Sequence, residues 1–188
     1  MITAVILAAG TSSRMGCCKQ LLPWKGKPLV RMVAEAALAS PANEVVVVTG
    51  CQASEVKAAL NPLPVKTVFN PNFPTGQGSS LAAGVKAASD QTAAFAILLA
   101  DQPLITSAII SELVAVYRQS HLLALRPTYR GQPGHPVLIS ASLRPKLEAL
   151  SGDQGARSLL ASLGDKVTDL EMDDLAIVFD IDTPEDLN

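Results

Sequence analysis

The sequence predicts an α/β fold whose central sheet is mainly parallel and covered by helices on both faces. Short apolar runs recur along the chain, and segments with a helical pattern separate them. Most of these runs are continuously apolar, which is typical of strands buried on both faces of a parallel sheet. The 188 residues, 48% of them hydrophobic, suffice for a substantial core. Because no linker or repeat divides the chain, we expect a single domain over residues 1–188.

The strands are predicted from runs of apolar and β-branched residues. The first run carries no charge and ends beside Gly10, the second contains four consecutive valines, and the central one reads Ala-Phe-Ala-Ile-Leu-Leu-Ala. In chain order, the expected strands are residues 4–8, 44–49, 65–69, 94–100, 122–125, 136–139 and 176–179.

The segments between the strands are rich in Ala, Leu, Glu and Lys, with apolar residues three or four positions apart. This spacing predicts helices over residues 28–39, 53–60, 78–89, 106–119, 141–150 and 155–163. Residues 126–135 are dense in Pro and Gly, and we expect a long surface loop there.

Charge and composition exclude several classes of protein. The 15 basic and 17 acidic residues give a net charge of -2 without any basic run, so we expect no nucleic-acid partner. No apolar run approaches the ~20 residues of a membrane span, and no signal-peptide pattern is present. The three cysteines match neither a disulfide framework nor a zinc site. A cytoplasmic protein is therefore expected.

The run from Val5 to Lys19 carries the strongest functional signal. An apolar strand leads into a loop of small residues that can offer backbone amides and hydroxyls, and two cations follow. This combination suits a polyphosphate, with Arg14 as a planar fork and Lys19 as a point charge. The alternative is a structural turn with solvated cations, and the pattern is neither a P-loop nor Gly-x-Gly-x-x-Gly. The expected nucleotide-binding residues are Leu7, Ala8, Ala9, Gly10, Arg14 and Lys19.

Two acidic segments are candidates for a metal site. Asp101 directly follows the central strand, and Asp182 shares a face with Asp180 if the segment is extended. Carboxylates from two strand ends, together with nucleotide phosphates, would suit hydrated Mg²⁺. Asp101 is equally well explained as a helix N-cap before Pro103, and Asp180 remains an alternative to Asp182.

Three further segments have both a functional and a structural interpretation. The amides and hydroxyls of Gly78, Ser79 and Ser80 could contact a base or ribose, or the serines could cap a helix. His135 could contact a substrate or only hydrogen-bond its loop. Asp153 and Arg157 could bind a phosphate group, or form an i,i+4 pair.

In order, these motifs resemble the molybdenum cofactor cytidylyltransferases and their guanylyltransferase relatives. The match comprises Leu-Ala-Ala-Gly-x-Ser-x-Arg-Met-Gly-x-x-Lys from Leu7, Gly-Gln-Gly-Ser-Ser-Leu from Gly76, Leu-x-x-Asp-Gln-Pro around Asp101, Gly-His-Pro at Gly134, Gly-Asp-x-Gly-Ala-Arg at Gly152 and an Asp-x-Thr-Pro-like end. Each motif is weak alone, but together they span nearly the whole chain. The resemblance implies a Rossmann-like three-layer fold of the nucleotide-diphospho-sugar transferase type.

The resemblance also implies the reaction and the site. We expect Mg²⁺-dependent transfer of CMP from CTP to molybdopterin, with Arg14, Lys19 and Asp101 as catalytic residues and Asp101 and Asp182 as metal ligands. His135, Asp153 and Arg157 would bind the acceptor, and a client molybdoenzyme could receive the product. Leu-Ala-Ala-Gly favours CTP over GTP, since the guanylyl branch usually reads Leu-Ala-Gly-Gly. Alternatives are a guanylyltransferase, a sugar- or polyol-phosphate nucleotidyltransferase, and a non-catalytic chaperone that carries the cofactor.

Overall fold

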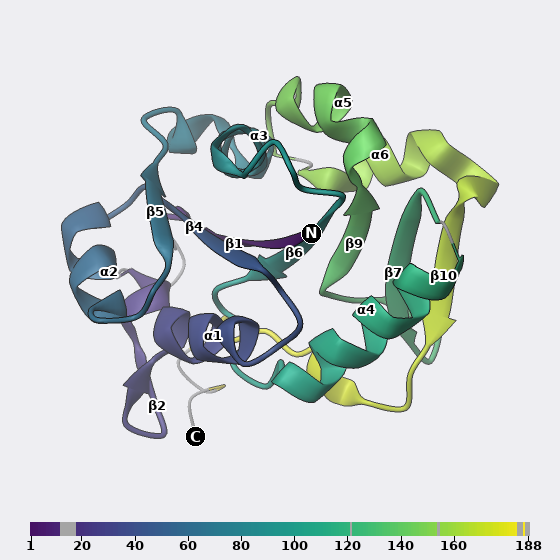
Figure 1. Cartoon of the computed structure of the whole chain (residues 1–188). Coiled ribbons are helices and arrows are strands. Elements are labelled where there is room, and N and C mark those ends of the chain that lie inside the picture. Colours follow the sequence, from purple (N-terminus) through teal and green to yellow (C-terminus); the bar gives the residue numbers. More distant parts are fainter. Residues whose placement is uncertain (12–17, 121, 154, 184–185, 187–188) are drawn as a thin grey trace.

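The computed structural model describes residues 1–11, 18–120, 122–153, 155–183 and 186. Its described residues build an eight-stranded sheet in the order β10-β7-β9-β6-β1-β4-β5, with β8 paired to β7 (Figure 1). The strands are β1 (Ile2–Ala8), β4 (Glu44–Thr49), β5 (Lys66–Phe69), β6 (Ala94–Leu99), β7 (Ala124–Tyr129), β8 (Gln132–Pro133), β9 (Val137–Ser140) and β10 (Val167–Glu171). Strands β5, β4, β1 and β6 run parallel, whereas β9 is antiparallel to both of its neighbours.

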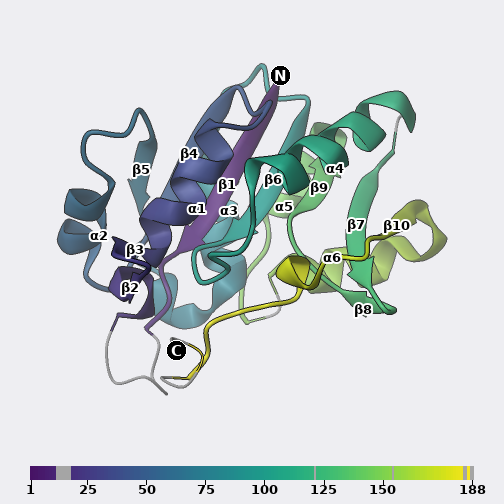
Figure 2. The ribbon, with the colours of Figure 1, turned by 90° about the horizontal axis from the view of Figure 1, so that it is seen from below.

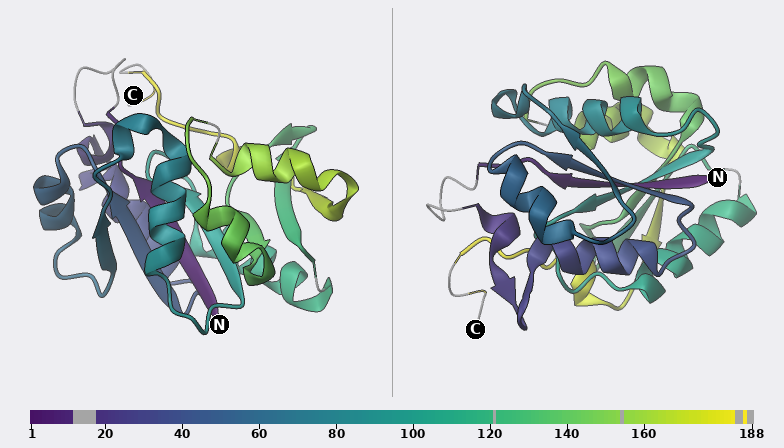
Figure 3. Two further views of the ribbon diagram at one scale, coloured as in Figure 1. Left: turned by 90° about the horizontal axis from the view of Figure 1, so that it is seen from above. Right: turned by 60° about the vertical axis from the view of Figure 1, so that its left-hand side comes forward.

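Helices cover both faces of the sheet, as Figure 3 shows in its right-hand view. Helices α1 (Leu29–Leu38) and α4 (Ser107–Ser120) lie on one face, and α3 (Gln77–Ala87), α5 (Arg144–Glu148) and α6 (Ala156–Leu163) lie on the other; α2 is Ala53–Leu60. Alternate residues of β1 divide between the two cores: Ile6 packs with α1 and α4, and Val5 with α3. The mainly parallel three-layer α/β fold is therefore confirmed.

Helix α3 lies very close to the sheet because Gly84 faces it. A Cβ atom at this position would come within 2.5 Å of Val5 Cγ1 and 2.8 Å of Val48 Cγ2. Glycine therefore allows the helix backbone to approach two central strands.

The remaining elements are short. Strands β2 (Pro23–Trp24) and β3 (Lys27–Pro28) form a separate two-stranded sheet. The 3-10 helices are η1 (Lys19–Leu21), η2 (Phe73–Thr75), η3 (Ala141–Leu143), η4 (Gly164–Lys166) and η5 (Leu175–Ile177).

Two sequence predictions were wrong in the second half of the chain, and one strand was missed. Residues 126–135 do not form one long loop, because β7 continues to Tyr129 and a tight turn at Arg130 and Gly131 leads into β8. The predicted strand 176–179 is the 3-10 helix η5, whose preceding Asp174 carboxylate accepts a hydrogen bond from the Ala176 amide. Strand β10 was not predicted, because it is a mostly exposed edge strand without a continuous apolar run.

The carboxyl ends of β1, β4 and β6 meet at one edge of the sheet because these strands are parallel neighbours. The amide of Cys51 donates to Ala9 O at 3.2 Å, and that of Ala100 donates to Leu7 O at 3.1 Å. Figure 2 shows the C-terminal segment after η5 returning to this edge. Ligands of open α/β sheets bind at such an edge.

None of the helices among the described residues has the length and apolar character that a membrane span requires.

Candidate active site

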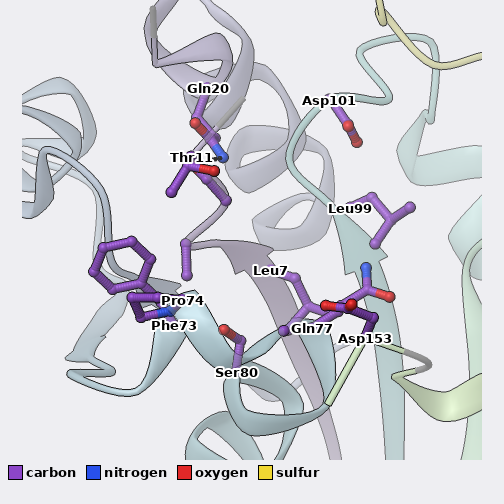
Figure 4. Close-up of a pocket in the computed structure, with 13 residues that line it drawn as sticks. Leu7, Thr11, Gln20, Phe73, Pro74, Gln77, Ser80, Leu99, Asp101 and Asp153 are labelled. Carbon is purple, nitrogen blue, oxygen red and sulfur yellow. Dashed lines mark hydrogen bonds between the residues drawn. The ribbon is translucent and has the colours of Figure 1, made fainter. Parts of the chain in front are cut away.

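A cavity of about 490 Å³ opens at the carboxyl ends of β1 and β6 (Figure 4). Figure 4 shows Gln20 and Asp101 on opposite sides of it, with Gln77 and Asp153 together below them. The lining residues are Leu7, Ala9, Gly10, Thr11, Gln20, Phe73, Pro74, Gly76, Gln77, Ser80, Leu99, Asp101 and Asp153. Of the residues that the sequence assigns to the nucleotide, Leu7, Ala9, Gly10 and Ser80 line this cavity, whereas Ala8 is fully buried in the core on the α1 face.

The side chain of Gln20 holds Gly10, which starts the loop of small residues before Lys19, called the glycine loop from here on. Its Nε2 donates to Gly10 O at 3.2 Å, and its Oε1 accepts from Cys18 Sγ at 3.0 Å. Gln20 is 6% exposed, so both contacts form in a largely dry environment. The described ends of the loop, at Gly10 and Cys18, are thereby tied to one another. Arg14 lies outside the described residues, as do Ser12 and Ser13.

Lys19 joins the two acidic segments that the sequence singled out. Its Nζ atom lies 2.6 Å from Asp101 Oδ2 and 2.7 Å from Asp182 Oδ1. The Lys19 side chain is 10% exposed, whereas those of Asp101 and Asp182 are 24% and 49% exposed. The first and last parts of the chain therefore meet at Asp101, which also lines the cavity.

The electrostatic balance at this point favours the charged ammonium. Burial alone lowers the pKa of Lys19, but the charge of Asp101 and hydrogen bonds to Asp101 and Asp182 outweigh it, so the pKa lies above its ordinary value. Lys19 therefore stays protonated at neutral pH. Its charge offsets part of the negative charge of the two carboxylates.

The C-terminal segment is fixed to the Asp101 turn by its backbone. The amide of Ile181 donates to Asp101 O at 3.0 Å, and Ile181 is fully buried. Just before it, the Phe179 ring packs against Trp24, with ring centroids 6.2 Å apart. Asp182 follows directly and therefore faces Lys19.

Asp180 has a different neighbour from Asp182. Gln102 Nε2 donates to Asp180 Oδ1 at 3.3 Å. Burial raises the pKa of Asp180, and the charges of Asp101 and Asp182 raise it further, against the lowering effects of Gln102 and Lys19. Of the two carboxylates that the sequence could not separate, Asp182 shares the Lys19 ammonium with Asp101.

The N-cap interpretation of Asp101 does not agree with the contacts at the start of the next helix, α4. Helix α4 begins at Ser107, and the side chain that accepts from an amide of its first turn is Thr106, whose Oγ1 is 3.3 Å from the Ile109 amide. In the C-terminal segment, another acidic side chain holds the backbone next to Asp182. Asp186 Oδ2 accepts from the amides of Asp182 and Thr183 at 3.0 and 2.8 Å.

Ser79 and Ser80, at the start of α3, face different surroundings. Ser79 Oγ lies 2.9 Å from the carbonyl oxygens of both Asn72 and Gly76, and it accepts from Asn70 Nδ2 at 2.9 Å. Its hydroxyl therefore stabilises the loop before α3. Ser80 also accepts from Asn70, at 3.1 Å, but lines the cavity.

Gly76 and Gly78 bring α3 against the loop that carries Asp153. The amide of Gly78 donates to Gly152 O at 2.8 Å, and a Cβ atom at Gly78 would lie 2.7 Å from Ser151 O. Gly76 has φ +119°, and a Cβ atom there would overlap the backbone of Gly152 and the carboxylate of Asp153. These glycines bring residues far apart in sequence to one wall of the cavity.

A second cavity of about 330 Å³ adjoins the first, and Gln77 and Asp153 line both. It is lined by all three residues predicted to bind the acceptor, namely His135, Asp153 and Arg157. The other lining residues are Gln77, Arg126, Pro133, Gly134, Val137, Ala156 and Leu160. Arg126 is fixed in place because Asp169 on β10 accepts from its Nε and Nη2 at 2.8 and 2.9 Å.

His135 is held at the base of the second cavity. Its amide donates to Ile177 O at 2.8 Å, and its Nδ1 lies 3.4 Å from Ile97 O. Burial lowers the pKa of His135, and the charge of Arg157 adds to this, against the raising effects of the Ile97 carbonyl and Asp101. The imidazole is therefore neutral at neutral pH and can hydrogen-bond a polar ligand.

Sequence reasoning missed several cavity residues. Gln20, Phe73 and Gln77 line the first cavity, and Arg126 lines the second. The usable signals were the position of Gln20 beside Lys19 and of Gln77 between two glycines of a quoted motif. Phe73 and Arg126 belong to segments that carry no distinguishing pattern.

Comparisons with known proteins identify a family for most of the chain. Residues 4–167 match the model of the MobA-like NTP transferase domain. The chain is 34% identical to nicotine blue oxidoreductase of Paenarthrobacter nicotinovorans, over 99% of this chain and 94% of that protein. It is 30% identical to molybdenum cofactor cytidylyltransferase of Escherichia coli K12, over 98% and 93% of the two chains.

Two solved structures are similar to this chain over nearly its whole length. Rv0371c of Mycobacterium tuberculosis H37Rv superimposes with a TM-score of 0.88 at 28% identity, covering 98% of this chain and 94% of that one. A second structure of Rv0371c is a complex with manganese, with a TM-score of 0.82 at 26% identity, covering 98% and 95% of the two chains.

Proposed function

Because the chain belongs to the MobA-like NTP transferase family and is a nucleotidyltransferase, we propose that it transfers CMP from CTP to molybdopterin. In this reaction, a phosphate oxygen of the acceptor attacks the α-phosphorus of CTP. The bond from the α-phosphorus to the oxygen of the β-phosphate breaks, and pyrophosphate leaves. The product joins the cytidylyl group to molybdopterin through a new phosphoanhydride bond.

The observation that carries the proposal is that Lys19 and Asp182 meet Asp101 at the first cavity, which shares two lining residues with the second. Two substrates must lie side by side for this transfer. Gln77 and Asp153 line both cavities, so the two sites are neighbours. We assign CTP to the cavity beside the glycine loop and the acceptor to the cavity that contains His135 and Arg157.

The residues present fit a divalent metal ion. Nucleotidyltransferases of this family typically use one. Asp101 and Asp182 offer hard oxygen donors, and their common contact with Lys19 Nζ supports the proposal that one cation is bound by both. Within the described part of the chain, no group of three or more His, Cys, Asp or Glu residues is gathered for a metal. The proposal therefore requires phosphate and water oxygens as the other ligands, as is usual for Mg²⁺.

The protein groups act by positioning and by neutralising charge. A bound Mg²⁺ would lower the charge on the triphosphate and draw electron density from the α-phosphorus. We expect the loop amides with Arg14 and Lys19 to hold the triphosphate, and Arg157 to hold the acceptor. Such a transfer needs no nucleophile from the protein, because the acceptor supplies the attacking oxygen.

The proposal is tested by looking for the cytidylylated product. Purified protein is incubated with molybdopterin, CTP and Mg²⁺, and the products are separated and identified by mass spectrometry. Formation of the cytosine dinucleotide supports the proposal. Tight binding of the finished dinucleotide without its formation would contradict transfer and favour the chaperone alternative. Transfer to a sugar or polyol phosphate in place of molybdopterin would contradict the acceptor assignment.

A further inference from the structure

The position of Lys19 allows it to contact two kinds of anionic partner, namely carboxylates of the protein and an anionic ligand in the first cavity. In the structure, its ammonium contacts Asp101 at 2.6 Å and Asp182 at 2.7 Å. Asp101 also lines the first cavity, and so does Gln20, the residue next to Lys19. An anionic ligand that fills this cavity as far as Asp101 therefore comes within reach of the Lys19 side chain.

A metal ion and the Lys19 ammonium compete for the same oxygens. A divalent cation bound to Asp101 Oδ2 and Asp182 Oδ1 would stand within a few ångströms of Nζ. Two cations repel at that separation, and the repulsion is strong where a side chain is largely buried. The ammonium can avoid it by moving to a new anionic partner, and a triphosphate in the cavity supplies one.

We propose that Lys19 is the internal counter-ion of Asp101 and Asp182, and that it leaves them when a nucleoside triphosphate binds. This inference rests on the proposed function, because it takes these carboxylates as the metal ligands. Metal and nucleotide then bind cooperatively, since each favours the state in which Lys19 contacts phosphate. Without nucleotide, Lys19 weakens the binding of metal.

The test measures binding of Mn²⁺ alone, in the absence of nucleotide, by isothermal titration calorimetry and electron paramagnetic resonance. Lys19→Met removes the charge and keeps most of the side-chain length, and Lys19→Arg keeps the charge. We expect Mn²⁺ to bind Lys19→Met roughly tenfold more tightly than wild type, because a charge-assisted contact at the carboxylates is lost. Lys19→Arg and the exposed control Lys57→Met should match wild type. Equal or weaker binding by Lys19→Met would overturn the inference.

Asp101→Asn separates this inference from the proposed metal site. Loss of Mn²⁺ binding in Asp101→Asn without tighter binding in Lys19→Met contradicts only the counter-ion role. Unchanged Mn²⁺ binding in Asp101→Asn contradicts the metal site itself.

If Lys19→Met does not fold, a crystal structure of the wild-type protein with both Mn²⁺ and CTP tests the inference. We expect Lys19 Nζ to have left Asp101 and Asp182. Mn²⁺ on Asp101 with both Lys19 contacts retained would overturn the inference.

Discussion

Lys19 Nζ and Asp101 Oδ2 lie 2.6 Å apart, although the two residues follow different strands of the sheet and are far apart in the sequence. The parallel pairing of β1 and β6 brings them to the same edge. The contact places a cation and a carboxylate beside the cavity that we assign to CTP. The first two predictions concern these residues.

Replacing Asp101 by Asn should abolish most turnover while the protein remains folded. Asn keeps the shape of the side chain and removes the charge that a metal ion and Lys19 both require. Steady-state kinetics over a range of Mg²⁺ concentrations, with circular dichroism as a check on folding, measure this. The exposed acid Asp90 provides a control as Asp90→Asn. Wild-type kinetics in Asp101→Asn would leave Asp101 with a structural role only.

Replacing Lys19 by Ala should weaken CTP binding or turnover by roughly tenfold to a hundredfold. The change removes a charge-assisted contact to phosphate of about 1.5–3 kcal/mol. Measured kcat and KM for CTP test it, with Lys57→Ala as a control at an exposed lysine. Unchanged kinetics in Lys19→Ala would remove this residue from the nucleotide site.

Gly78→Ala should lower the free energy of unfolding by about 1–3 kcal/mol, the usual cost of overpacking. The new Cβ atom would lie 2.7 Å from Ser151 O and 2.8 Å from Ser151 C, and both are backbone atoms that cannot rotate away. Urea unfolding monitored by circular dichroism measures the change. Stability equal to wild type would indicate that the 151–153 loop shifts without cost.

His135 should make stability depend on pH below neutrality. Its pKa in the folded protein is lowered by burial from an ordinary value of 6.5, so the unfolded chain binds the proton more strongly. The free energy of unfolding should therefore fall as pH drops below about 6.5, by at most ~1.4 kcal/mol per pH unit from this group. The difference between wild type and His135→Gln from pH 7 to 5 isolates the effect. A constant difference would contradict the lowered pKa.

The sequence was sufficient to predict the part of the site that strand order determines. Continuous apolar runs before Gly10 and Asp101 indicated buried parallel strands, and parallel strands end at one edge. The convergence of Asp101 and Asp182 was predicted from two strand ends, but the segment before Asp182 contains the 3-10 helix η5 in place of a strand. Asp182 lies near Asp101 because the Ile181 amide donates to Asp101 O, which strand order alone does not predict. The sequence also did not indicate that Lys19 lies between Asp101 and Asp182, because its position depends on how η1 and the C-terminal segment pack.

Elements at the edge of the fold were harder to predict. Strand β10 pairs only with β7 and exposes Thr168, Asp169 and Glu171, so it lacks the continuous apolar run of a buried strand. Arg126 enters the second cavity because Asp169 on this strand fixes it, and such a long-range pairing leaves no local pattern. The glycines at positions 76 and 78 were quoted as part of a motif, but their close packing on the 151–153 loop required the structure.

Release of pyrophosphate tests the central claim most directly. Wild-type protein is incubated with molybdopterin and each of the four nucleoside triphosphates, with and without Mg²⁺, and pyrophosphate is measured over time. The account predicts release that requires both Mg²⁺ and molybdopterin and is fastest with CTP. Equal or faster release with GTP would contradict the cytidylyl assignment and leave the reaction class standing. No release with any of the four nucleotides would contradict nucleotidyl transfer to molybdopterin.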